Sequence, residues 1–155
     1  KVDIMVNNAG KIVNKRIEET SDNEFDAQFN VNIKGPFKLA KALHEHFPEN
    51  SHIVNITSMG GYQGSMKFPG LGIYSSSKGA VSIFTEALAE EWKERKVSVN
   101  ALALGAVQTE MLSEAFPQMT VDTAPDEIAE YIGHFALTGH KFFNGKVLPV
   151  TNSTP

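Results

Sequence analysis

Four short apolar segments, each separated from the next by a stretch long enough to hold a helix, constrain the fold of this chain most. They are residues 2–6, 52–57, 97–102 and 146–150. The first of them is almost continuously apolar, as in a central strand that is covered on both faces. Strands that alternate with helices imply a parallel sheet. The pattern therefore predicts an α/β domain.

The intervening stretches have helical patterns with recognisable ends. Residues 22–46 carry a roughly helical apolar stripe that begins at Ser21 with a capping-box pattern. A second helix is predicted over residues 74–94. A third is predicted from about residue 125 to 137, with Thr123 as its cap and Pro125 in its first turn. A short segment over residues 109–115 lies between the last two helices.

Composition limits the kinds of partner. The chain has 155 residues, 41% of them hydrophobic, which suits one core but is short for a doubly wound sheet that wraps a dinucleotide. A net charge of -4 without a basic cluster argues against nucleic acid or an anionic membrane. Cysteine is absent, and the five histidines lack metal-ligand spacing, so no metal site is predicted. A cytoplasmic location is the default expectation.

Tyr74 and Lys78 form the most suggestive pair of side chains. Four residues apart on one helix, they share a face, and the ammonium of Lys78 can lower the phenol pKa from its reference of about 10. The start of a helix also favours negative charge. Ser58 ends an apolar strand, at the edge of the sheet where open α/β folds hold ligands. The pair alone is a weak signal, since such pairs are commonly only surface contacts.

Several ordered motifs together resemble the classical short-chain dehydrogenase/reductase family. They are NNAG at residues 7–10, Asn32 in FNVNIKGPF, Ser58 in IVNITSMGG, YSSSK at 74–78 and VNALALGAVQTEM at 99–111. The resemblance covers nearly the whole chain. It implies a Rossmann-type three-layer sandwich and an oxidoreductase that transfers a hydride between a nicotinamide cofactor and an alcohol or ketone.

The resemblance also implies roles for individual residues. Asn32, Ser58, Tyr74 and Lys78 match the catalytic tetrad. Tyr74 would exchange a proton with the substrate oxygen, Ser58 would hydrogen-bond that oxygen, and Lys78 would hold the nicotinamide ribose and keep Tyr74 acidic. NAD or NADP would contact residues in three of these motifs: Asn8, Ala9 and Gly10 in NNAG, Tyr74 and Lys78 in YSSSK, and Leu104, Gly105, Val107 and Thr109 in VNALALGAVQTEM. Leu104 departs from the family's proline, which puts the shape of that loop in question.

One family motif is missing from the sequence. The glycine-rich phosphate-binding turn is found nowhere in it, so nothing distinguishes NAD from NADP. We therefore interpret residues 1–150 as the C-terminal portion of a single dinucleotide-binding and catalytic domain, and residues 151–155 as a tail. The strand at residues 2–6 would then lie at an edge of the sheet. A non-catalytic scaffold, or an inert fragment, is the alternative to an enzyme.

Gly35-Pro36 interrupts the first long helix. Proline cannot donate the hydrogen bond that would reach the carbonyl of Asn32, four residues earlier. In the family this carbonyl holds a water that passes protons toward the lysine, so Pro36 is predicted to leave it available. The alternative is a simple kink in a surface helix.

The substrate and the assembly are less constrained. Residues 63–72 form a loop whose apolar side chains, with those after Thr109, could line a pocket for a small alcohol or carbonyl compound with some hydrocarbon bulk; the same loop residues could equally pack on each other. Family analogy implies a homodimer or homotetramer that pairs the helices at residues 22–46 and 74–94.

Overall fold

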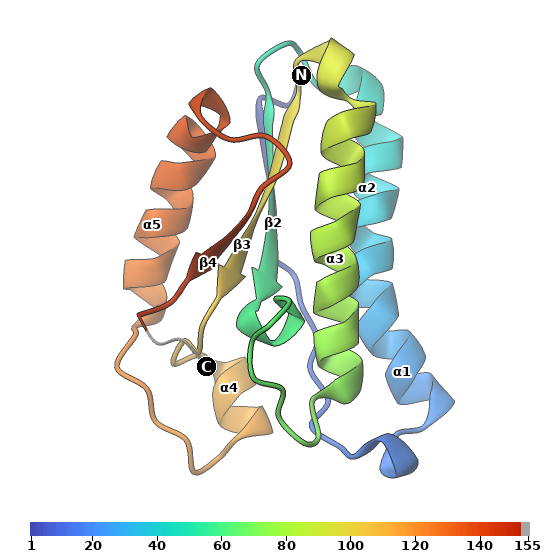
Figure 1. The fold of residues 1–155 in the computed structure, drawn as a ribbon, viewed down its shortest axis with the longest axis vertical. Coiled ribbons are helices and arrows are strands. Elements are labelled where there is room, and N and C mark those ends of the chain that lie inside the picture. The colour runs from blue at the N-terminus through green and yellow to red at the C-terminus, as the bar shows by residue number, and fades with distance from the viewer. Residues whose placement is uncertain (153–155) are drawn as a thin grey trace.

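The computed structural model describes residues 1–152, and these residues form one parallel sheet flanked by helices (Figure 1). The strand order is β1-β2-β3-β4. All three neighbouring pairs are parallel. The predicted parallel α/β architecture is confirmed. The strands are β1 (Ile4–Asn7), β2 (His52–Ser58), β3 (Ser98–Leu104) and β4 (Val147–Val150).

The helices lie close to where the sequence predicts them. The first long stretch divides into α1 (Asp22–Phe29), a π-helical turn (Asn30–Lys34), α2 (Gly35–Leu43) and a 3-10 turn (His44–His46). The later helices are α3 (Gly72–Glu91), α4 (Glu110–Ala115) and α5 (Pro125–Thr138). Further 3-10 turns cover Ile17–Glu19, Met59–Gly61, Lys93–Arg95 and Gly139–Lys141.

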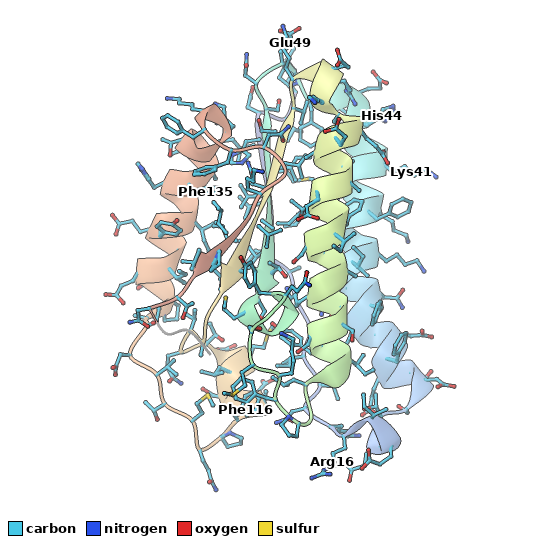
Figure 2. The ribbon with its side chains drawn as sticks, in the orientation of Figure 1. Arg16, Lys41, His44, Glu49, Phe116 and Phe135 are labelled. Carbon is cyan, nitrogen blue, oxygen red and sulfur yellow. The ribbon has the colours of Figure 1, made fainter. Side chains whose placement is uncertain are left out.

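The helices cover both faces of the sheet, which makes the predicted three layers (Figure 1). On one face, Ile53 and Val99 pack with Ala40 of α2 and Leu88 of α3. On the other face, Val54 and Leu102 pack with residues of α5. Phe135 points from α5 toward the sheet (Figure 2), and its ring centroid lies 5.5 Å from that of His52. Burial on both sides explains why successive residues of β2 and β3, such as Ile53 and Val54, are both apolar.

The two predicted helix starts have different outcomes. At α1 the capping box is confirmed: Glu24 N–H donates to Ser21 Oγ at 3.3 Å, and Ser21 N–H donates to Glu24 Oε2 at 3.0 Å. At α5 the prediction of Thr123 as cap is wrong, because the N-cap residue is Ala124. The Glu127 carboxylate accepts the Ala124 N–H at 3.2 Å, so an acidic side chain inside the helix satisfies that donor instead.

Strand β1 lies at an edge of the sheet, as predicted. Ile4 and Val6 are 37% and 39% exposed, although strands of this composition are normally covered. Of the predicted tail, Thr151 and Asn152 have no regular secondary structure, and residues 153–155 lie outside the described residues.

Candidate active site

The four predicted catalytic residues lie on three neighbouring elements near the carboxyl ends of the strands. Ser58 is the last residue of β2, Tyr74 lies in the first turn of α3, and Lys78 follows one turn later. Asn32 lies in the π-helical turn. Strand ends of a parallel sheet open toward the ligand side of an α/β fold. The arrangement brings the four residues to one end of the molecule, where α4 also lies (Figure 1).

The Ser58 hydroxyl lies close enough to the Tyr74 phenol to lower its pKa by hydrogen bonding. The Ser58 Oγ also accepts the Gly60 N–H at 3.1 Å, which fixes the hydroxyl at the start of the turn. Burial raises the pKa of the Tyr74 phenol above its ordinary value of 10.0, and the bond from Ser58 opposes that effect only in part. Tyr74 is therefore a protonated phenol at neutral pH.

The predicted lowering of the Tyr74 pKa by Lys78 is wrong in this structure. The Lys78 Nζ donates to the Ile56 carbonyl at 2.9 Å and lies 6.0 Å from the centroid of the Tyr74 ring. The helical spacing correctly puts both side chains on one face. However, the ammonium is held by a strand carbonyl, and burial of the phenol outweighs the charge nearby.

Lys78 is almost fully buried, at 4% exposure, and burial lowers its pKa to about 8. The ammonium has no carboxylate within ion-pair distance among residues 1–152. A lysine with such a pKa can take up and release a proton close to neutral pH.

Gly61 lets the turn that follows Ser58 approach the backbone of α3, a role that the sequence motifs did not predict. A methyl group built on Gly61 would lie 2.5 Å from the Gly79 nitrogen and 2.5 Å from the Lys78 carbonyl carbon. The turn after Ser58 thus packs directly on the backbone of α3, and only glycine allows this approach. The small-residue run Met59-Gly60-Gly61 was the available signal.

The Asn32 side chain joins the segment after β1 to α3. Its Oδ1 accepts the Lys11 N–H at 2.7 Å, and its Nδ2 donates to the Lys11 carbonyl at 2.9 Å and to the Ser77 Oγ at 2.8 Å. The Ser77 hydroxyl in turn donates to the Tyr74 carbonyl at 2.7 Å. Ser77 was not predicted, although it lies three residues after Tyr74 and so shares its helix face.

The predicted break at Gly35-Pro36 is a π-helical turn. The Gly35 N–H reaches back five residues to the Asn30 carbonyl. Pro36 has no N–H with which to bond the Asn32 carbonyl. The interruption is confirmed, and the relay water at that carbonyl stays a prediction.

Asn8, Ala9 and Gly10 follow the carboxyl end of β1. A methyl group built on Gly10 would lie 3.5 Å from the Lys78 Nζ, 3.6 Å from the Met111 Cε and 3.7 Å from the Asn32 Oδ1. Three side chains from different parts of the chain therefore surround the space in front of Gly10. A bare backbone beside a cation and an amide suits the sugar hydroxyls of a dinucleotide.

The loop after β3 contains the other predicted cofactor residues. Leu104 ends β3, and the Gly105 N–H donates to the Val150 carbonyl at 3.0 Å. Thr109 caps α4, since its Oγ1 accepts the Leu112 N–H at 3.2 Å. A cavity of about 550 Å³ borders Gly105 and Val107. The chain keeps its extended course without the family's proline, because Leu104 still pairs with Ser58.

Other kinds of site find no support in residues 1–152. That part of the chain has no group of three or more His, Cys, Asp or Glu side chains that could hold a metal ion. Within the same residues, no helix combines the length and the apolar character needed to cross a bilayer.

Comparison with known proteins gives a consistent result. A family model described as short chain dehydrogenase matches residues 1–120. The 2-dehydro-3-deoxy-D-gluconate 5-dehydrogenase of Dickeya dadantii (strain 3937) is 39% identical over 112 residues, which cover 70% of this chain and 43% of that protein. The (2S)-[(R)-hydroxy(phenyl)methyl]succinyl-CoA dehydrogenase subunit BbsD of Thauera aromatica is 35% identical over 162 residues, covering 97% and 64%.

The fold also matches solved structures. A 3-ketoacyl-(acyl-carrier-protein) reductase from Brucella melitensis, complexed with NADH, superposes with a TM-score of 0.84 at 32% identity. The match covers 97% of this chain and 66% of that one. The chain thus spans between 43% and 66% of the length of these three proteins.

Proposed function

The chain belongs to the short-chain dehydrogenase family, and from that premise we propose that the whole protein is an oxidoreductase dependent on NAD or NADP. Its substrate would be a small alcohol or carbonyl compound. The observation that carries the proposal is the interaction of the half-buried Ser58 and Tyr74 hydroxyls, with the Lys78 ammonium 6.0 Å from the centroid of the phenol ring. A hydroxyl pair beside a buried cation suits proton transfer to a substrate oxygen.

The protein's own residues would supply the proton and the orientation. The nicotinamide cofactor, when bound, supplies or accepts the hydride. Tyr74 keeps its proton at neutral pH because burial raises its pKa, so it can donate to the oxygen of a carbonyl compound. Ser58 can hydrogen-bond the same oxygen, because its hydroxyl already contacts Tyr74.

Lys78 would return a proton to Tyr74 after each turnover. Its pKa of about 8 lets the ammonium release a proton close to neutral pH. The Asn32 carbonyl, to which Pro36 cannot donate, would hold the water that connects Lys78 to solvent. This relay is part of the proposal and is supported by the break in the helix at Pro36.

The residues that would hold the cofactor line the strand ends. Gly10 offers bare backbone beside Lys78, and Gly105 and Thr109 begin and end the loop between β3 and α4. The remaining predicted contacts are those of Asn8, Ala9, Leu104 and Val107. The relative from Brucella melitensis was solved with NADH, which supports the same class of ligand here.

The test is dinucleotide binding and turnover by the full-length protein as encoded, with Tyr74→Phe as the variant. We expect Tyr74→Phe to bind NADH or NADPH like the wild type and to lose at least about 100-fold in kcat, because the proton donor is gone. Tyr131→Phe, an exposed phenol on α5, is the matched control and should keep full activity. Full activity in Tyr74→Phe would contradict the proposal, and binding without any turnover in the wild type would favour a scaffold.

We also propose that the protein forms homodimers or homotetramers through α2 and α3, which cover the same face of the sheet and contribute Ala40 and Leu88 to one core cluster. Phe37 and Leu39 of α2 are 49% and 45% exposed, and Ile83 of α3 is 66% exposed. Exposed apolar side chains on two helices that cover the same face of a sheet are compatible with an interaction surface. Ile83→Glu should lower the mass measured by analytical ultracentrifugation; an unchanged mass would contradict this interface.

A further inference from the structure

Met111 also borders the space in front of Gly10, and it has no role in the proposed catalytic steps. A methyl group placed on Gly10 would contact Met111 Cε at 3.6 Å, at almost the same distance as Lys78 Nζ and Asn32 Oδ1. Met111 belongs to α4, 101 residues away in sequence. Its thioether end therefore reaches across from α4 to the carboxyl end of β1, beside the ammonium of Lys78, which is predicted to hold the cofactor, and the side-chain amide of Asn32.

This placement conflicts with a bound dinucleotide. The inference rests on the proposed function, in which the cofactor reaches Lys78 by lying against the Gly10 backbone. A glycine at this point allows a ligand to approach closely, and the Met111 methyl group lies 3.6 Å from the point that a Cβ on Gly10 would occupy. We propose that Met111 is a displaceable plug, which fills the cofactor space next to Lys78 when no dinucleotide is bound and withdraws when one binds.

The attachment of α4 suits such a movement. The helix has six residues, and helices this short are not stable by themselves. Its carboxyl end is tied by the Asn14 Nδ2, which donates to the Ala115 carbonyl at 2.9 Å on the exposed surface. Methionine has three rotatable side-chain bonds, so Met111 can also withdraw by changing rotamer alone.

A plug lowers the apparent affinity for the ligand it excludes. The measured Kd equals the intrinsic Kd divided by the fraction of molecules whose site is open. Met111 is half-buried, so its contacts stabilise the closed state by part of the transfer free energy of a methionine side chain. Removing them by Met111→Ala should tighten dinucleotide binding by about three- to tenfold.

The first experiment is a fluorescence titration of the full-length protein with NADH and NADPH. Met111→Ala is compared with the wild type and with Met119→Ala, a matched change at a residue that follows α4 and is 42% exposed. We expect a lower Kd only in Met111→Ala. An unchanged Kd overturns the proposal, and a higher Kd overturns it by indicating that the thioether contacts the bound dinucleotide.

The second experiment observes Met111 directly, by NMR of protein labelled with ¹³C at the methionine methyl groups. The Met111 signal is assigned by its loss in Met111→Leu, which preserves most of the side-chain volume. Without cofactor, this signal should titrate with a midpoint near the Lys78 pKa of about 8. Adding dinucleotide should move it much more than the Met119 signal.

The outcomes separate this inference from the proposed function. Dinucleotide binding with an unmoved Met111 signal overturns the plug and leaves the oxidoreductase proposal standing. If the wild type and all variants fail to bind either dinucleotide, both proposals fall. In that case the pH titration would still report whether Met111 lies beside Lys78.

Discussion

Replacing Lys78 by methionine should change how the stability of the protein depends on pH. The buried ammonium has a pKa of about 8 in the folded chain, against 10.5 for an ordinary lysine. A pKa lowered by folding means that the unfolded chain binds the proton more tightly between these two values. The buried ammonium therefore lowers the free energy of unfolding at and below pH 8, and this loss of stability disappears as the pH rises toward 10.5.

The size of the effect follows from the two pKa values. Between pH 8 and pH 10 the free energy of unfolding of the wild type should rise by about 2 kcal/mol from this one group. Lys78→Met removes the titrating group and keeps an unbranched apolar side chain, so its free energy of unfolding should lack this rise. Tyr74 acts in the opposite direction from about pH 10, where the phenol of the unfolded chain ionises before the buried one, but the wild type and Lys78→Met share this contribution, so the difference between their profiles isolates Lys78.

The assay is urea denaturation followed by circular dichroism at pH 7, 8, 9 and 10. Lys38→Met removes an exposed lysine of α2 and serves as the control, whose profile should run parallel to that of the wild type. If the pH profile of Lys78→Met also runs parallel to that of the wild type, burial of the ammonium does not lower the free energy of unfolding. The argument for Lys78 as a proton carrier near neutral pH would then fail.

Three further predictions concern packing and buried polar groups. Gly61→Ala should destabilise the fold by about 3 kcal/mol in urea denaturation because its methyl group would overlap the backbone of α3, whereas Gly133→Ala, where a methyl group meets nothing within 4 Å, should be neutral or slightly stabilising. Asn32→Ala should cost about 3 kcal/mol in the same assay, since it removes three hydrogen bonds; a loss below about 1 kcal/mol would argue against a buried clamp. Burial lowers the pKa of His52, and the hydrogen bond that its Nδ1 donates to the Ala136 carbonyl opposes this only in part. Wild-type stability should therefore fall as the pH drops below 6.5, and His52→Gln should flatten that fall.

The architecture could be predicted from the sequence because burial leaves a periodic pattern. Strands β2 and β3 are covered on both faces, so apolar residues lie on both sides of each strand and the segments are easy to recognise, although the buried Asn55 and Asn100 interrupt them. The break before α2 was predictable for a different reason, since Pro36 lacks an N–H whatever its surroundings. The cap of α5 was not predictable from a preference for threonine, because the N-cap lies one residue later, at Ala124, whose N–H donates to the Glu127 carboxylate.

The candidate site was predictable as a set of residues but not as a set of contacts. Spacing puts Tyr74 and Lys78 on one face of α3, but it cannot tell that the Ile56 carbonyl will hold the ammonium. Gly61 and Ser77 act through partners from other elements, at Gly79 and Asn32, which a linear pattern does not pair. Long-range packing decides these contacts, and it is visible only in the folded chain.

Burial shifts the pKa values of Tyr74 and Lys78 in opposite directions, and this determines which of the two side chains titrates closer to neutral pH. It raises the pKa of Tyr74 above 10.0 and lowers that of Lys78 to about 8, so each is pushed toward its neutral form. A phenol that keeps its proton suits the reduction of a carbonyl compound, in which the proton is given away. Oxidation of an alcohol would require the phenolate, which the same burial disfavours. Under the proposed function, Lys78 rather than Tyr74 should therefore set the alkaline limb of the pH profile for carbonyl reduction.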